Sequence, residues 1–124
     1  MKILVADDSR VMRQIVIRTL RQAGYGDAEI CEATDGAHGL IQFSDFGPDL
    51  VLSNWNMPEL NGIDMLRSLR ASGYTGPFGF VTSEGSPQMR ELASASGADF
   101  LVAKPFNADV LREHIESSLG ATQR

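Results

Sequence analysis

Short runs rich in apolar side chains alternate with longer helical patterns along the whole chain. Five such runs are bounded by turn residues and have the length of strands. Near-continuous apolar runs of this kind are typical of parallel strands that are buried on both faces. We therefore predict strands near residues 2–6, 28–32, 49–53, 78–81 and 99–103.

The segments between these runs predict five helices. The first should run from about Ser9, a good N-cap, to Ala23, with Gly24 as the stop. Its apolar residues recur at helical spacing and predict the buried side: Val11, Met12, Ile15, Val16 and Leu20. Its arginines fall largely on the other side, which is either a solvated face or a docking surface: Arg10, Arg13, Arg18 and Arg21.

Caps, glycines and prolines predict the other helix boundaries. The second helix opens at Asp35-Gly36 and ends before Gly47-Pro48, the third runs from about Leu60 to Ser72, Ser86-Pro87 starts the fourth, and Asn107 caps the fifth. The fifth has a predicted buried stripe of Val110, Leu111, Ile115 and Leu119. The alternation of strands and helices predicts an α/β fold, a parallel sheet covered by helices on both faces.

Length and composition predict one globular domain, residues 1–124. Because the fifth helix ends close to the last residue, we expect no output domain. The alternative that this domain was cut from a longer protein stays open. The net charge of −5 argues against direct nucleic-acid binding. Cys31 is the only cysteine, so an intrachain disulfide is excluded and a reducing compartment fits.

The chain also lacks the signals of membrane proteins and of exported proteins. No apolar stretch approaches the roughly 20 residues that a membrane span requires. The N-terminal apolar run meets Asp7 too early for a signal peptide. We expect a cytoplasmic protein without a membrane partner.

Polar residues that could take part in catalysis or bind a ligand follow four of the predicted strands. The acid pair Asp7-Asp8 follows the first strand, Asn54 the third, Thr82 the fourth, and Lys104 the fifth. Each is weak evidence alone, because an acid pair is usually a helix cap and a Lys-Pro step is usually a turn. The combination in this order is far more specific, and it spans the whole chain.

This constellation resembles the receiver domain of bacterial two-component response regulators, especially the stand-alone chemotaxis type. The resemblance implies a flavodoxin-like fold with five helices and strand order 2-1-3-4-5. It also implies that the polar strand ends converge in one crevice beyond the carboxyl ends of the strands, where ligands of such sheets bind. In that family, an aspartate at the position of Asn54 accepts a phosphoryl group from a phosphohistidine.

The resemblance also implies a Mg²⁺ site and a role for each crevice residue. Asp8, the side chain at position 54 and the backbone carbonyl of Asn56 would bind the ion, with Asp7 acting through water. Such oxygen ligands suit Mg²⁺, and a cation relieves the repulsion among carboxylates. Lys104 and the Thr82 hydroxyl would stabilise the phosphoryl oxygens. A cis Lys104-Pro105 bond is expected, turning the lysine toward the crevice.

Asn54 departs from the family pattern. Its amide is a poor nucleophile, and replacing an anionic ligand should weaken Mg²⁺ binding without abolishing it. One account is a deliberate substitution that holds an ordinary receiver unphosphorylated; the other is a natural pseudo-receiver acting as a phosphate-independent interaction module. We favour substitution, because Thr82 and Lys104 still match the family. Deamidation of Asn54 and phosphorylation of Ser53 are weaker alternatives.

A second departure concerns the output switch. In the family, an aromatic residue three positions before the lysine rotates inward as the Thr82 hydroxyl moves. Here that position is Leu101, and the neighbouring Phe100 is interpreted as a strand residue packed against a helix. The chain therefore lacks the aromatic residue on which this relay depends at that position. The hypothesis that remains for the output is a two-state surface over the fourth helix, fifth strand and fifth helix.

Other classes of protein with a parallel sheet fit the sequence less well. Phosphatases that form aspartyl-phosphates carry Asp-x-Asp after the first strand, whereas this chain has Asp7-Asp8-Ser9-Arg10. A nucleotide- or flavin-binding module would need a glycine-rich phosphate loop there. We therefore expect a signalling receiver rather than an enzyme. Its expected partners are a sensor histidine kinase or phosphotransfer protein, docking on the first helix and the loops around the crevice, and an unidentified downstream protein. We expect a monomer.

Overall fold

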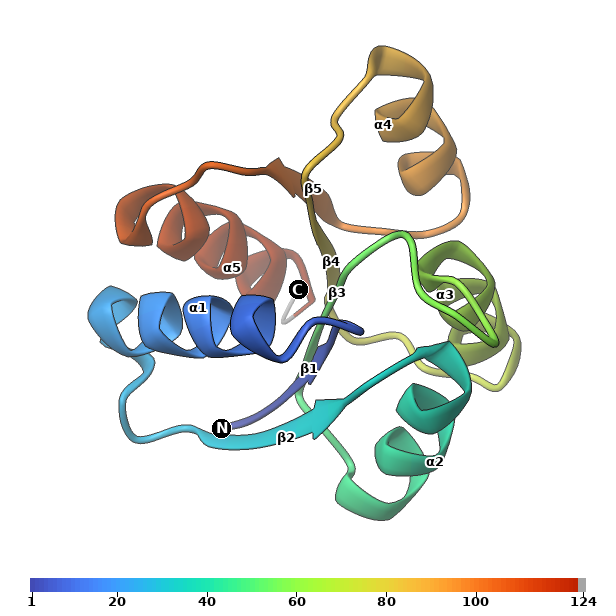
Figure 1. The fold of residues 1–124 in the computed structure, drawn as a ribbon, viewed down its shortest axis with the longest axis horizontal. Coiled ribbons are helices and arrows are strands. Elements are labelled where there is room, and N and C mark those ends of the chain that lie inside the picture. The colour runs from blue at the N-terminus through green and yellow to red at the C-terminus, as the bar shows by residue number, and fades with distance from the viewer. Residues whose placement is uncertain (123–124) are drawn as a thin grey trace.

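The computed structural model describes residues 1–122, and they form one five-stranded parallel sheet with helices on both faces (Figure 1). The sheet order is β2-β1-β3-β4-β5, as expected. The strands are β1 (Lys2–Ala6), β2 (Glu29–Ala33), β3 (Leu50–Ser53), β4 (Phe78–Thr82) and β5 (Phe100–Ala103). The helices are α1 (Arg10–Leu20), continued by a π-helical turn (η1, Arg21–Tyr25), α2 (Gly36–Phe46), α3 (Gly62–Ala71), α4 (Pro87–Ala95) and α5 (Ala108–Thr122).

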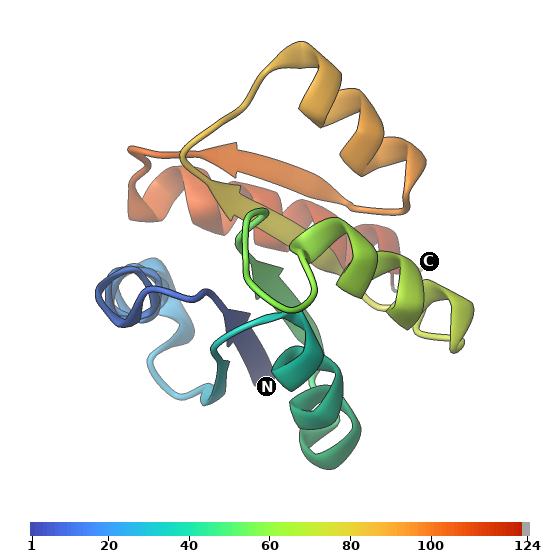
Figure 2. The same cartoon turned by 45° about the vertical axis from the view of Figure 1, so that its right-hand side comes forward.

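Two hydrophobic layers hold the sheet between its helices. Helices α1 and α5 cover one face, and α2, α3 and α4 cover the other (Figures 1 and 2). Side chains alternate along β1, so Ile3 and Val5 pack under α1 and α5 while Leu4 packs in the layer under α2 and α3. Strands β3 and β4 are buried throughout, as the sequence predicts for central strands. Strand β2 is only partly buried because it lies at the edge of the sheet.

The predicted N-caps of four helices are confirmed by side-chain hydrogen bonds. Ser9, Asp35 and Ser86 accept from the backbone N–H three residues on, and Asn107 accepts from the N–H of Val110. Helix α3 starts two residues after the approximate predicted start at Leu60, because Asn61 caps the helix by accepting from the N–H of Asp64 at 2.9 Å. Gly24 has a φ of 104° and interrupts the helical backbone, as its predicted role requires.

Two residues assigned to buried stripes are exposed instead. In α1, Val16 and Leu20 are buried, whereas Val11 is 65% exposed. At 3.6 residues per turn, Val11 lies about half a turn away from Leu20, so it cannot face the same layer. In α5, Leu111 and Ile115 are fully buried, but Val110 lies at the rim of the helix and is 38% exposed.

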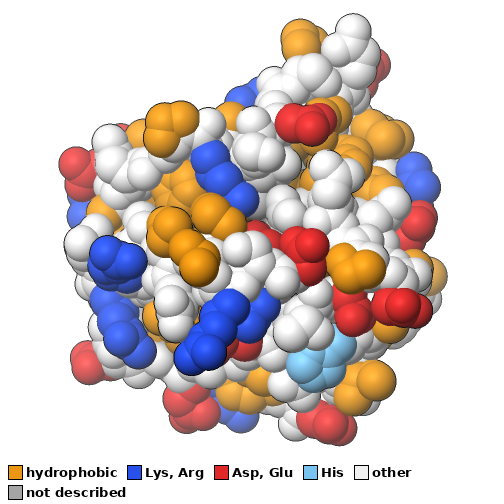
Figure 3. Space-filling view, viewed as in Figure 1, with side chains coloured by type: hydrophobic (Ala, Val, Ile, Leu, Met, Phe, Trp, Pro, Cys, Tyr) orange, Lys and Arg blue, Asp and Glu red, His pale blue; other side chains and the backbone are white. Residues whose placement is uncertain are grey.

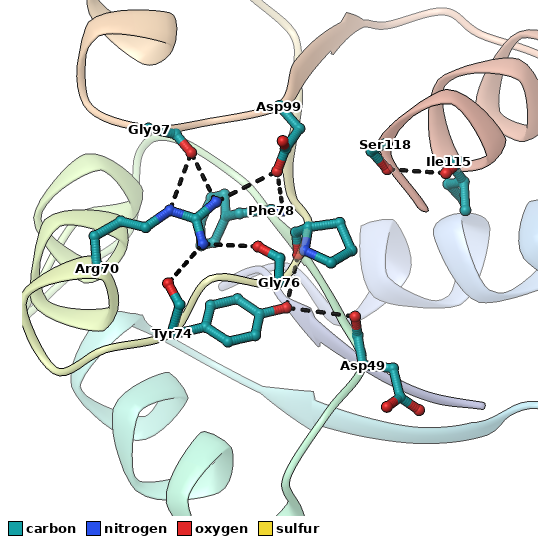
Figure 4. A network of polar contacts seen from close by, with 10 residues as sticks. Asp49, Arg70, Tyr74, Gly76, Phe78, Gly97, Asp99, Ile115 and Ser118 are labelled. Carbon is teal, nitrogen blue, oxygen red and sulfur yellow. Dashed lines mark hydrogen bonds and ion pairs between the residues drawn. The ribbon is translucent and has the colours of Figure 1, made fainter. Parts of the chain in front are cut away.

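Arg70 ties together the end of the sheet where β4 and β5 begin (Figure 4). Its guanidinium donates to the carbonyl oxygens of Tyr74, Gly76 and Gly97 at 2.7–3.1 Å. It also pairs with Asp99, whose Oδ2 accepts from the N–H of Phe78 at 2.9 Å. One side chain therefore fixes the loops that lead into two neighbouring strands.

None of the helices within residues 1–122 combines the length and apolar character needed to cross a membrane.

Candidate functional site

Strand pairing brings the polar strand ends together. Ala6 of β1 pairs with Ser53 of β3, so Asp7 and Asn54 leave the sheet side by side, and the N–H of Asn54 donates to the carbonyl of Ala6 at 2.9 Å. Thr82 of β4 pairs with Ala103 of β5, and the N–H of Lys104 donates to the Thr82 carbonyl at 2.8 Å. The crevice that these residues line therefore lies beyond the carboxyl ends of four strands.

Asp7 is the buried acid of the crevice, with 3% of its surface exposed. Its Oδ1 accepts from the N–H of Ser9 at 2.9 Å, and its Oδ2 lies 3.8 Å from the Nζ of Lys104. Burial raises the pKa of the Asp7 carboxyl above its ordinary value of 3.8. The Ser9 N–H and Lys104 oppose this rise in pKa, and the nearby Asp8 adds to it. Asp7 and Lys104 thus form the charged pair at the floor of the crevice.

Asp8 and Asn56 lie at the open side of the crevice. Both are exposed, and they line a hollow of about 480 Å³ together with Met57, Pro58 and Asn61. The Asp8 carboxylate and the Asn56 carbonyl present hard oxygen atoms to this space. Such donors fit the oxygen preference of Mg²⁺, so the residues present suit the ion that the resemblance implies.

Asn54 makes a hydrogen bond that an aspartate could not make. Its Nδ2 donates to the backbone carbonyl of Asn56 at 3.0 Å. The amide thereby engages the carbonyl that was predicted to be a metal ligand. Within residues 1–122, no three Asp, Glu, His or Cys side chains gather closely enough to hold a metal ion. The crevice therefore contributes two carboxylates and neutral oxygens.

Thr82 and Lys104 take the positions that the sequence predicts for them. Thr82 is buried, and its Oγ1 accepts from the N–H of Glu84 at 3.3 Å. The Lys104-Pro105 peptide bond is cis, as expected, and the lysine side chain turns toward Asp7. Ser53 is buried, and its hydroxyl donates to the Asn54 carbonyl at 2.8 Å.

The aromatic arrangement near β5 agrees with the sequence interpretation. Phe100 is 8% exposed and stacks on His114 of α5, with ring centroids 5.4 Å apart. Leu101 is also buried and lies on the other side of β5. Trp55 packs on Phe80 at 4.8 Å between ring centroids and is half-buried beside the crevice. Trp55 is therefore a natural fluorescence reporter for this site.

Arg13 is a site residue that the sequence analysis assigned to the outer side of α1. Its side chain is only 11% exposed. Its Nη1 donates to the carbonyl of Asp7 at 2.7 Å, and its Nε donates to Glu32 at 2.9 Å. Arg13 thus holds the segment that carries the acid pair against α1 and β2. No local sequence signal indicates this role, because the main acceptor is a backbone carbonyl.

Comparison with known proteins agrees with this geometry. The family model described as the response regulator receiver domain matches residues 3–116. Chemotaxis protein CheY1 of Helicobacter pylori strain J99 is 35% identical over 123 residues, 97% of this chain and 98% of that protein. Chemotaxis protein CheY of Pseudomonas aeruginosa is 38% identical over 118 residues, 94% of each chain.

Solved structures show the same fold. A response regulator receiver domain protein from Clostridium thermocellum superposes with a TM-score of 0.86 at 27% identity, covering 98% of this chain and 96% of that one. Chemotaxis protein CheY4 of Vibrio cholerae superposes with a TM-score of 0.83 at 32% identity, covering 95% and 98%. The chain therefore belongs to the response regulator receiver domain family.

Proposed function

We propose that this chain is a phosphorelay receiver whose reaction is blocked at a single position, Asn54. The observation that supports the proposal is that the other reactive residues of the crevice are present around position 54. Asp7, Thr82 and Lys104 surround position 54 with the charges and hydroxyl that phosphoryl transfer requires. With aspartate at position 54, a carboxylate oxygen would attack the phosphorus of a phosphohistidine as the P–N bond breaks.

The crevice residues divide the work of that reaction. The Lys104 ammonium would neutralise charge on the equatorial oxygens, and the Thr82 hydroxyl would donate to one of them. Asp8, the side chain at position 54 and the Asn56 carbonyl would hold Mg²⁺, with Asp7 acting through water. The ion would supply further positive charge for the phosphoryl oxygens. In the Asn54 form the nucleophile is missing, so the chain stays unphosphorylated.

The proposed partners are a sensor histidine kinase or phosphotransfer protein and a downstream target, all working in the cytoplasm. An apolar hollow of about 360 Å³ beside the crevice supports docking of the phosphodonor there. Its lining is Met12, Ile15, Lys104, Pro105 and Phe106. Figure 3 shows hydrophobic side chains exposed between α1 and α5, with Lys and Arg side chains close by. A donor protein with an apolar centre and acidic rim would match this surface.

A comparison of this chain with its Asn54→Asp variant tests the proposal. Both proteins receive Mg²⁺ and acetyl phosphate, and intact mass spectrometry detects a bound phosphoryl group. We expect the group only on the aspartate variant, and we expect it to be lost on alkaline treatment, as an acyl phosphate would be. An Asn54→Asp, Lys104→Met double variant controls for the crevice chemistry. If the Asn54→Asp variant gains no phosphoryl group, the chain is a phosphate-independent interaction module.

A further inference from the structure

Arg90, in the first turn of α4, joins two main-chain segments from different parts of the fold. Its Nε donates to the carbonyl of Gly85, in the loop that follows β4, at 3.2 Å. Its Nη1 donates to the carbonyl of Leu101, in β5, at 3.1 Å. An exposed arginine on a helix is usually just solvated, but this one bridges two backbone acceptors in a forked geometry that suits guanidinium.

The Leu101 carbonyl is available to Arg90 because β5 is an edge strand. Within residues 1–122 it pairs only with β4, so its outer carbonyls have no strand partner and need another donor. Gly85 permits the close approach: a Cβ there would lie 3.1 Å from the Arg90 Nη2 and 3.1 Å from the Ala103 Cβ. The bridge therefore uses the edge position of β5, and the missing side chain at residue 85 leaves room for the guanidinium.

The bridge begins three residues after Thr82. The Thr82 hydroxyl accepts from the N–H of Glu84, so its present position is linked to the loop that holds Gly85. A hydroxyl can accept and donate at the same time, so a Thr82 hydroxyl that moves to donate to an oxygen in the crevice would draw the Glu84 N–H and its loop with it. With Leu101 buried and Phe100 stacked on α5, neither side chain is free to carry that motion to β5 by rotating inward.

We propose that Arg90 is the positioning residue that couples the Thr82 loop to β5 in this chain, in place of a rotating aromatic side chain. The inference rests on the proposed function. Arg90 and Leu101 also line a hollow of about 530 Å³ together with Phe106, Val110 and His114. A movement of the bridge therefore reaches an exposed groove between β5 and α5, where a downstream protein would detect it.

Amide chemical shifts in the Asn54→Asp background test this coupling. Mg²⁺ and beryllofluoride, which mimics an aspartyl phosphate, are added to the parent, to Arg90→Met and to Arg90→Lys. In the parent we expect shifts at Glu84, at Gly85 and at Leu101 with the same midpoint, together with a change in the Arg90 Nε–H resonance. In both variants the shifts in the loop should persist while those in β5 are lost, because a single ammonium lacks the fork.

Arg67→Met is the matched control, because the Arg67 side chain is 52% exposed and, within residues 1–122, its ion pair is with Asp64 of its own helix at 3.7 Å. It should leave the β5 shifts intact. Recording the spectra well below the unfolding midpoint of each variant separates coupling from stability. If β5 still responds fully in Arg90→Met, the inference is wrong. If the parent shows no shift even at Glu84 and Gly85, the proposed function itself fails, and the inference falls with it.

Discussion

At position 54, an amide and a carboxylate place opposite demands on the neighbouring Asn56 carbonyl. The Asn54 amide donates to that oxygen at 3.0 Å, so the two groups satisfy each other. A carboxylate has no donor, and it would face the same carbonyl oxygen with repulsion unless a cation lay between them. Asn54 therefore makes a favourable contact with the Asn56 carbonyl by itself, whereas an aspartate at this position needs a bound cation between the two groups.

This difference predicts the order of Mg²⁺ affinities. Asn54→Asp should bind Mg²⁺ at least about tenfold tighter than Asn54, since one extra anionic ligand is readily worth about 1.4 kcal/mol. Titration followed by Trp55 fluorescence or calorimetry measures both constants. Asp8→Asn in the Asn54→Asp background should reverse the gain. Equal affinities of the two proteins would show that the side chain at position 54 does not contact the ion.

Asp7 predicts a pH dependence of stability. Burial raises its folded pKa above 3.8, whereas the unfolded carboxyl titrates near 3.8. Between these values the folded protein keeps a proton that the unfolded chain has released, so the free energy of unfolding falls as pH rises through this window. The lost stability is not regained at higher pH.

Urea unfolding of this chain and of Asp7→Asn across that pH range measures the effect. The advantage of Asp7→Asn in the free energy of unfolding should grow as pH rises from below 3.8 and then level off. Asp64→Asn, at a partly exposed acid, is the control. A difference that does not change with pH would mean that the Asp7 pKa is not raised.

For single helices, the sequence predicted features that depend on neighbouring residues, such as N-caps, but not features that depend on tertiary packing. Ser9, Asp35 and Ser86 mark helix starts because a cap acts within one turn, and the sequence displays that turn completely. Whether an apolar residue faces the sheet depends on how the helix is rotated. Val11 and Val110 match the periodicity of a helix but lie outside its buried arc.

The crevice residues were predictable for a related reason. Each follows a hydrophobic run, and parallel strands end on the same side. The strand order that brings them together was implied by the family resemblance alone, and the structure has that order. Arg13 and Arg90 could not be found in this way. Their acceptors are backbone carbonyls of other elements, which carry no mark in the sequence.

Arg70 gives a prediction about how elements are held together. Arg70→Met should lower the free energy of unfolding by about 2–4 kcal/mol, because it leaves several part-buried carbonyls and Asp99 without their charged donor. Chemical denaturation measures the loss. Arg67→Met, at an exposed arginine of the same helix, should cost less than about 0.5 kcal/mol. Equal effects would show that the Arg70 network adds no stability.

Across the whole molecule, the two ends of the sheet have different tasks. The Arg70 network lies where β4 and β5 begin, and the crevice lies where the strands end. Substitutions in the network should therefore change stability while leaving the crevice geometry intact. The crevice end holds loops and exposed apolar side chains, and the proposed docking surface lies there.

The apolar hollow beside the crevice predicts a difference between large and small phosphodonors. Met12 and Ile15 of α1 line it, and neither contributes to the chemistry at position 54. In the Asn54→Asp background, Met12→Gln should slow transfer from a phosphorylated histidine phosphotransfer domain about tenfold, the effect of losing a contact worth about 1.4 kcal/mol. Transfer from acetyl phosphate, which needs no docking surface, should keep its rate. Leu92→Gln, at an exposed leucine of α4, should change neither rate. Equal slowing with both donors would place the defect in the crevice and rule out this surface as the docking site.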